Sequence, residues 1–190
     1  MKHIFATISI ILAAVCLRLV PHVPNFAPVG ALCLFGGTYL SKKYAVFVLL
    51  ATMLLSDYLL LYVHPFSADF FTFSHIYSPL ALLHTTSVFV YGSFLVTVGI
   101  GLFLKKHQSV ENIMLASLTS SLLFFLITNF GVWATGMYSR NISGLWESYL
   151  MGLPFFRATV FGDLFYAGIF FGSYYIITTL SYANLYKNRR

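Results

Sequence analysis

Long apolar runs alternate with short polar or proline-rich stretches along the whole chain. A helix needs about 20 apolar residues to cross a hydrocarbon core about 30 Å thick, so a chain of this length holds five or six such helices, and the runs indicate about six spans. The expected spans cover residues 4–20, 29–41, 44–63, 86–104, 112–134 and 158–181. We therefore expect an all-α fold, a polytopic transmembrane helical bundle that forms a single integral-membrane domain over residues 1–190.

The second run is short and follows a proline-rich stretch. Residues 21–28 contain Pro21, Pro24 and Pro28 and cannot form a regular helix. The run that follows then offers about 13 residues, or about 20 Å of helix. Either this helix is short, or the proline-rich stretch enters the membrane, where irregular backbone must be covered by protein or line a cavity. Short or broken helices of this kind point to a binding site.

Composition indicates that the solvent of this chain is lipid. Apolar residues make up 59% of the 190 positions and charged residues 8%, whereas about a quarter of the residues of a soluble domain are charged. Such a chain cannot cover its surface with polar groups in water. The first run could be mistaken for a signal peptide. Because Arg18 and the prolines follow it in place of a small-residue cleavage site, we interpret it as a retained span.

The net charge of +6 comes from basic residues that stand between or after the apolar runs, such as Lys42–Lys43 and Lys105–Lys106. The opposite set of span ends carries only Arg18, Arg140 and Arg157. Because Lys and Arg are enriched in cytoplasmic loops, both termini are expected to face the cytoplasm. We expect a multi-pass protein of the bacterial inner membrane, in contact with the lipid bilayer and without a nucleic-acid partner.

With this orientation the longer connections all face outward, and long outer loops usually carry recognition. The last of them is expected to cover residues 135–156, a stretch that contains Gly136, Gly144, Gly152 and Pro154. Within it, residues 145–150 are expected to form a short interfacial helix that holds Trp146 and Tyr149 at the depth of the lipid headgroups.

Several polar groups fall at a similar depth. At a rise of 1.5 Å per residue, Asp57, Asn129 and Asp163 are expected about 8–10 Å below the outer surface. Charged groups inside a membrane are costly unless paired, and they normally face the bundle interior or a cavity. One interpretation is an Arg18–Asp57 or Arg157–Asp163 pair that only ties helices together. The other is the polar floor or wall of a ligand site that is open to the outside, and the two are compatible.

The sequence shows no catalytic or metal-binding motif. Four histidines are expected on the outer side: His22, His64, His75 and His84. They could ligate a metal-centred cofactor, but none has an i, i+4 partner or an accompanying carboxylate. Cys16 and Cys33 lie inside apolar runs and are expected to be buried small residues. We expect neither an enzyme nor a resident cofactor or metal.

Small residues form a stripe on the first span. Ser9 and Ala13, with Ala14 beside it, have the small-xxx-small spacing that allows another helix to approach closely. Two uses stay open: packing inside the bundle, and docking of a partner subunit.

Five longer strings carry a resemblance to a known family. They are PxxPNFAPVGALxLFGG (21–37), LLSD (54–57), HxxxVxVYGSF (84–94), LLFFLxTNFGVW (122–133) and GLPFFRATVFGD (152–163). Together they resemble a bacterial family of integral-membrane proteins of unknown function. That family is in turn distantly similar to the S components of energy-coupling-factor vitamin transporters, in size, span number, loop pattern and the small-residue stripe.

The resemblance to S components implies a function and a partner. S components capture a vitamin or metal from outside and then topple against a transmembrane coupling subunit driven by two ATPases. Ser9, Ala13 and Ala14 would then form the docking stripe, although the usual Ala-xxx-Ala is Ser-xxx-Ala here.

We expect a substrate-binding membrane subunit for uptake of a small, vitamin- or cofactor-like molecule. The alternative is a non-transporting scaffold or accessory subunit with structural ion pairs. The expected ligand-binding residues are Asn25, Phe26, Asp57, His84, Asn129, Trp133, Arg157 and Asp163. The aromatic side chains of Trp146, Phe155 and Phe156 would add flat apolar contacts to a ring-bearing ligand.

Overall fold

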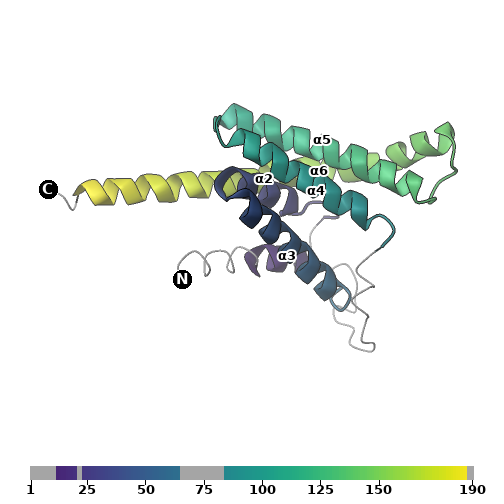
Figure 1. Ribbon diagram of the computed structural model, residues 1–190, viewed down its shortest axis with the longest axis horizontal. Coiled ribbons are helices and arrows are strands. Elements are labelled where there is room, and N and C mark those ends of the chain that lie inside the picture. The colour runs from purple at the N-terminus through teal and green to yellow at the C-terminus, as the bar shows by residue number, and fades with distance from the viewer. Residues whose placement is uncertain (1–11, 21–22, 65–83, 188–190) are drawn as a thin grey trace.

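The computed structural model describes residues 12–20, 23–64 and 84–187, and every element in this part of the chain is a helix (Figure 1). Residues 12–19 form a helical segment, which we call the N-terminal segment. The remaining helices are α2 (Val29–Tyr39), α3 (Lys42–Leu60), α4 (Ser87–Leu104), α5 (Val110–Ala134) and α6 (Ile142–Lys187). The all-α fold is therefore confirmed, and three expected spans, 44–63, 86–104 and 112–134, are helices with ends shifted by a few residues at most.

Four of these helices are long and apolar enough to cross a membrane: α3, α4, α5, and α6 over Ile142–Leu180. The helix α2 is apolar but has only 11 residues, about 16 Å at 1.5 Å per residue. Of the two alternatives for the second run, the structure therefore shows the short helix. The first expected span falls partly outside the described residues, so a total of six crossings and their direction stay predictions.

The prediction for residues 135–156 was wrong. They do not form a loop with a separate interfacial helix over 145–150, and the last helix does not begin at 158. Instead α6 begins at Ile142 and runs for 46 residues with Pro154 inside it. Asn141 starts the helix, because its Oδ1 accepts a hydrogen bond of 2.8 Å from the Gly144 N–H.

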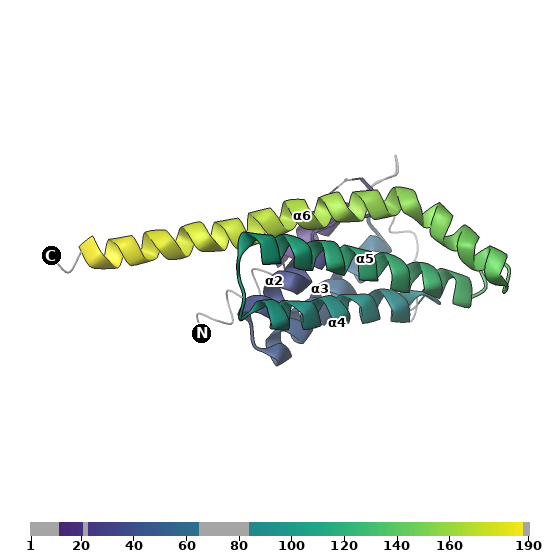
Figure 2. The same ribbon diagram turned by 90° about the horizontal axis from the view of Figure 1, so that it is seen from above.

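Pro154 bends α6 without ending it. Proline lacks the N–H that would bond to the carbonyl four residues earlier, so a helix that continues through it is kinked. Figure 2 shows this bend in the N-terminal third of α6. Two contacts hold the first turns of α6 on α5: Ser148 Oγ donates to the Asn129 carbonyl at 2.8 Å, and Tyr149 OH donates to the Leu126 carbonyl at 3.0 Å.

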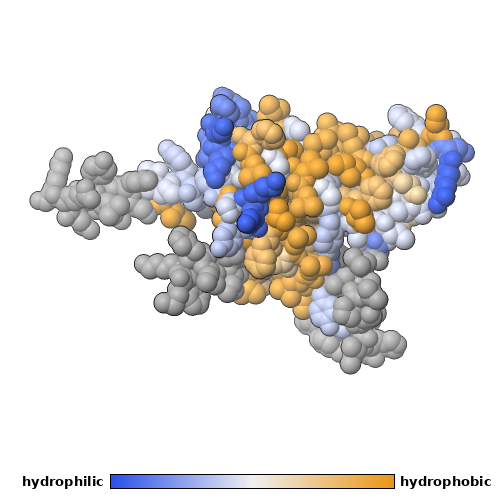
Figure 3. Space-filling view, viewed as in Figure 1, coloured by the Kyte–Doolittle hydropathy of each residue, from blue (hydrophilic) through white to orange (hydrophobic). Residues whose placement is uncertain are grey.

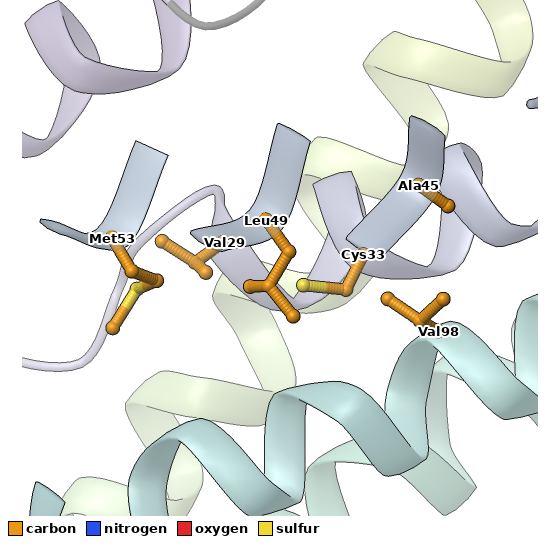
Figure 4. Packing of buried hydrophobic residues seen from close by; sticks show 6 residues of the cluster. All are labelled: Val29, Cys33, Ala45, Leu49, Met53 and Val98. Carbon is orange, nitrogen blue, oxygen red and sulfur yellow. The ribbon is translucent and has the colours of Figure 1, made fainter. Parts of the chain in front are cut away.

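The short α2 lies at the centre of the bundle, packed against α3, α4, α5 and α6. All its residues except Phe35 and Tyr39 are buried. Val29 and Cys33 of α2 meet apolar side chains of α3 and α4 in one core cluster (Figure 4). Cys33 is thus buried as expected, whereas Cys16 is exposed and that prediction was wrong.

Glycines allow α2 and α4 to cross closely. A Cβ atom on Gly37 would collide with the Val98 carbonyl oxygen, and one on Gly101 would collide with the Leu34 carbonyl oxygen. Thr38 Oγ1 donates across the same crossing to the Gly101 carbonyl at 3.2 Å. The last turns of α2 and α4 therefore meet, which brings the basic residues that follow them, Lys42–Lys43 and Lys105–Lys106, to one end of the bundle. The turn between α5 and α6 lies at the opposite end (Figure 1).

The surface between these ends is apolar. Figure 3 shows hydrophobic residues over the middle of the bundle, with hydrophilic residues gathered toward the two ends of its long axis. Large apolar side chains such as Phe103 and Phe161 are 84% and 68% exposed. An exposed apolar band of this kind marks contact with lipid or protein. Together with the four long helices, it identifies the chain as a membrane protein.

Candidate functional site

One of the two ion pairs considered from the sequence is present. Arg18 Nη1 lies 2.8 Å from Asp57 Oδ1 and joins the N-terminal segment to α3. Tyr91 OH of α4 donates to Asp57 Oδ2 at 2.7 Å, and Arg18 Nη1 also donates to Ser56 Oγ. The side chains of Arg18 and Asp57 are only 16% and 12% exposed. The pair therefore satisfies both charges inside the bundle and holds three elements together.

The other candidate pair, Arg157–Asp163, does not form. Arg157 lies exposed on the surface of α6, while Asp163 is buried in the bundle. Six residues on one helix correspond to about 600° of rotation at 3.6 residues per turn, which places the two side chains on different faces. Asp163 has other partners.

Asp163, which is far from α2 in the sequence, caps the N-terminus of that helix. The Ala31 N–H in the first turn of α2 donates to its carboxylate, and Ser121 Oγ of α5 donates to Oδ2 at 2.6 Å. The first N–H groups of any helix lack partners within it, and the local cap residue, Pro28, offers no side-chain acceptor. A carboxylate from α6 takes that role, at the helix end where negative charge is favoured.

Beside Asp163 lies a cavity of about 230 Å³, which we call the polar chamber. Every described helix and the segment before α2 contribute to its wall. The lining residues are Arg18, Asn25, Ala27, Val29, Gly30, Met53, Val90, Phe94, Thr97, Ser120, Phe124, Thr159 and Asp163. The proline-rich stretch, for which the sequence left a place along a cavity as one alternative, contributes Asn25 and Ala27 to this wall. Asn25 is exposed and has a positive φ of 65°, a conformation that asparagine tolerates better than most residues.

A second cavity of about 170 Å³ adjoins the first between α5 and α6, and we call it the aromatic chamber. The two share Asn25, Phe124 and Thr159. The other lining residues of the aromatic chamber are Phe125, Thr128, Asn129, Val132, Gly152, Phe155 and Phe156. Asn25 is thus an exposed residue that lines both chambers.

Asn129 contributes to the aromatic chamber through its contact with α6. Its Nδ2 donates to the Phe125 carbonyl of its own helix at 2.8 Å. A Cβ atom on Gly152 would collide with the Asn129 side chain, so glycine is needed where α6 crosses it. Asn129 therefore sets the spacing of α5 and α6 at this end of the chamber.

A buried hydroxyl in the polar chamber has no partner. Ser120 is 3% exposed, and no residue that the structure describes forms a hydrogen bond with its Oγ. Buried polar atoms are almost always hydrogen-bonded, and leaving one unsatisfied costs about 1–3 kcal/mol. Since Ser120 lines the chamber, a bound molecule or water can supply the missing partner.

Of the predicted ligand-binding residues, Asn25, Asn129 and Asp163 line the two chambers, as do the aromatic residues Phe155 and Phe156. Asp57 lines neither chamber, but it forms the ion pair with Arg18, which lines the polar chamber. The structure does not bring His84 to the site: its side chain is exposed, and its backbone N–H bonds to Ser87 Oγ at the start of α4. His22 and His75 lie outside the described residues.

Three predicted aromatic residues also lie away from the chambers. The Phe26 ring packs against Phe165 and Tyr166 of α6, with centroids 5.6 and 5.7 Å apart. Trp133 Nε1 donates to the carbonyls of Ser139 and Asn141 and so closes the turn between α5 and α6. Trp146 is 65% exposed on the surface.

Sequence reasoning missed Thr97, Ser120, Phe124 and Thr159 as lining residues. Thr97 and Thr159 each donate to the carbonyl four residues earlier in their helix, at 3.1 and 2.9 Å. Hydroxyls of this kind are common in membrane helices and give no signal in a single sequence. Only the bundle geometry shows that they converge.

The small-residue stripe is divided between surface and core. Ala13 is exposed, whereas Ala14 is 2% exposed and packs with Val15, Leu32 and Val48. Ser9 lies outside the described residues. Of the two alanines, only Ala13 is therefore available to a partner helix.

The fold and site define a class: an α-helical membrane protein whose helices enclose paired polar and aromatic chambers around a short central helix. Residues 1–185 match the family described as "Family of unknown function (DUF6580)", and the chain belongs to that family. The resemblance to a family of unknown function is thereby confirmed. No curated protein and no solved structure matches the chain. The distant similarity to S components stays a prediction.

Proposed function

We propose that this protein is the substrate-binding membrane subunit of an uptake system for a small molecule. The observation that carries the proposal is the polar chamber, a cavity of about 230 Å³ inside the bundle with the buried Asp163 carboxylate and an unpartnered Ser120 hydroxyl in its wall. Small-molecule sites are concave and mostly apolar, with a few convergent polar groups. The two adjoining chambers have this composition.

The position of Asn25 and of the aromatic chamber favours loading from outside. Asn25 is exposed and borders both chambers, and the aromatic chamber extends to Val132 in the last turn of α5. That end of the bundle is opposite to the Lys42–Lys43 and Lys105–Lys106 clusters. By the distribution of Lys and Arg, it is the outer end.

The two cavities, with an ion pair that fixes the wall of one of them, support ligand binding over a purely structural role. A scaffold gains stability when its interior is filled, because every void loses packing contacts. Here the interior has two adjoining cavities, and the ion pair of Arg18 and Asp57 fixes one wall. The scaffold or accessory subunit remains the second candidate function, and the observation that favours it is this same ion pair, which ties helices together without any ligand.

A partner subunit follows from the same proposal. Energy for uptake would come from a transmembrane coupling subunit with ATPases, as in the S components that the sequence resembles. Ala13, the exposed small residue of the N-terminal segment, is the position at which a partner helix can approach closely.

The test is a thermal-shift screen of vitamins, related cofactors and metabolites on the purified full-length protein in detergent. A ligand at 100 times its Kd stabilises the folded state by about 2.7 kcal/mol. Thr159→Leu places a larger side chain in the shared wall and should remove the stabilisation. Thr178→Leu is the matched control, because Thr178 also lies on α6 and donates to the carbonyl four residues earlier at 2.8 Å but lines neither chamber.

Two results would favour the scaffold instead. One is that no compound in the set raises the melting temperature. The other is that every active compound stabilises Thr159→Leu as much as the wild type, since binding would then take place elsewhere. Uptake of the active compound into cells that express the protein, lost in Thr159→Leu, would establish transport.

A further inference from the structure

We propose that the ligand is a small organic ammonium compound, with a protonated amine bound in the polar chamber and an apolar or aromatic body in the aromatic chamber. The inference rests on the proposed function and adds the chemical class of the ligand. Its basis is an imbalance of charge around the polar chamber, together with the unpartnered Ser120 hydroxyl and the composition of the second chamber.

Among the described residues, Arg18 is the one cation that lines the polar chamber, and it already has its counter-charge. Arg18 is paired with Asp57 at 2.8 Å. Every other Lys or Arg whose side chain the structure describes is exposed: Lys42, Lys43, Lys105, Lys106, Arg140 and Arg157. Asp163 thus has no cationic partner in the described part of the chain. A carboxylate buried without one is costly, and a bound cation would remove this cost.

Asp163 also has hydrogen-bonding capacity left. An ionised carboxylate offers about four lone-pair sites. Ser121 Oγ and the Ala31 N–H occupy two of them. An ammonium group has only donors, so it can bond to the remaining carboxylate sites and to the free Ser120 Oγ at once. A carboxylate or phosphate ligand would instead face Asp163 as a like charge.

The aromatic chamber favours an organic cation over a metal ion. Phe124, Phe125, Phe155 and Phe156 line it. Phenyl rings attract ammonium groups and pack well on flat apolar bodies. Among the described residues, no three His, Cys, Asp or Glu side chains are grouped so that they could hold a metal ion. A bare ion would also leave the second chamber without an occupant.

The experiment compares three probes with one aromatic body: 2-phenylethylamine, 2-phenylethanol and phenylacetate. Binding to the purified full-length protein is measured by calorimetry and thermal shift at neutral pH, with methylammonium and sodium chloride as small-cation probes. The amine should bind the wild type about tenfold or more tightly than the alcohol, since a hydrogen bond to a charged group is worth about 1.5–3 kcal/mol. Phenylacetate should bind more weakly still.

Two serines on α5 provide a matched pair of variants. Ser120 and Ser117 are both buried, and neither Oγ has a partner among the described residues, but only Ser120 lines the chamber. Ser120→Ala should weaken amine binding several-fold, and Ser117→Ala should leave it unchanged. Asp163→Asn should abolish the preference for the amine over the alcohol. Asp163 also caps α2, so Asp163→Asn could fail to fold. In that case the two serine variants still show whether the amine binds in the polar chamber.

The results separate this inference from the proposed function. Phenylethanol or phenylacetate binding as tightly as the amine would overturn the ammonium class and leave a ligand-binding chamber. The ammonium class would also be overturned if sodium ions alone stabilised the protein to the same extent as the amine. Equal amine affinity in Ser120→Ala, Ser117→Ala and wild type would place binding outside the polar chamber. No binding by any amine probe, while a neutral or acidic compound from the screen binds through Thr159, would reject the inference and keep the function.

Discussion

Asp163 of α6 lies against Gly30 in the first turn of α2, so closely that a Cβ atom on residue 30 would collide with its carboxylate. The contact places an acid from the last helix at the N-terminal N–H groups of a helix that begins 134 positions earlier in the chain. Because α2 has only 11 residues and the N–H groups of its first turn have no acceptor within the helix, the cap matters more here than for a long helix. The same carboxylate borders the polar chamber.

The first prediction tests the contact between Asp163 and Gly30 by adding a single methyl group at residue 30. Gly30→Ala should lower the free energy of unfolding by about 1–3 kcal/mol, because the added Cβ forces Asp163 or α2 to move. Gly99→Ala in α4 is the control, since a Cβ there meets nothing within 4 Å and alanine is the better helix former. Thermal unfolding in detergent measures both. Equal stability of the two variants would show that Asp163 does not pack on α2 as described.

The buried acids could be found from the sequence because a charged residue is conspicuous in an apolar run. The sequence predicts Asp57 and Asp163 as buried acids in this way, and it offers Arg18–Asp57 as one of two candidate ion pairs, of which only this one forms. The short α2 was recognised because three prolines and Lys42–Lys43 leave little room between them. These features follow from chain length, charge and proline stereochemistry, which need no tertiary information.

The start of α6 could not be found by the same rules. Gly144, Gly152 and Pro154 are typical of a loop, and local propensity favours one. In the fold, Gly152 is required by the close contact with Asn129, and Ser148 bonds to α5. Tertiary packing therefore overrides the local signal. The predicted set of lining residues was incomplete for a related reason. The Ser120 hydroxyl resembles any other hydroxyl in a membrane helix, and only the packing of the neighbouring helices places it in the wall of the polar chamber.

A second prediction concerns the ion pair. Asp57→Ala should destabilise the protein by about 3–5 kcal/mol, because it leaves the Arg18 charge buried and unpaired. It also removes the acceptor of the Tyr91 hydroxyl. Glu147→Ala is the exposed control and should change stability by less than about 0.5 kcal/mol. Replacing both partners, as in Arg18→Met with Asp57→Leu, should cost less than Asp57→Ala alone. A double variant less stable than the single one would contradict a buried pair.

A third prediction is the direction of the helices in the membrane. The described fold places Lys42–Lys43 and Lys105–Lys106 at one end of the bundle and residues 136–141 at the other (Figure 1). Reporter fusions after Lys43 and Lys106 should be active in the cytoplasm, and insertions at 138–141 should be accessible from outside, because basic residues are retained inside. A cytoplasmic signal from all three positions would contradict the assignment of α5 and α6 as helices that cross the membrane.

The last prediction uses two neighbouring alanines to decide whether a partner docks on the N-terminal segment. Ala13→Leu adds bulk to an exposed position, so folding, detergent stability and ligand binding should stay near wild type. Ala14→Leu adds the same bulk where Val15, Leu32 and Val48 are packed, and should lower the free energy of unfolding by about 1–3 kcal/mol. If a coupling subunit binds this face, Ala13→Leu should abolish its co-purification and the uptake it drives, since a bulky residue prevents close approach of helices. Melting temperature and co-purified subunits are read from the same preparations. A partner that remains bound to Ala13→Leu would place docking elsewhere, and uptake by the protein without any co-purified subunit would remove the need for one.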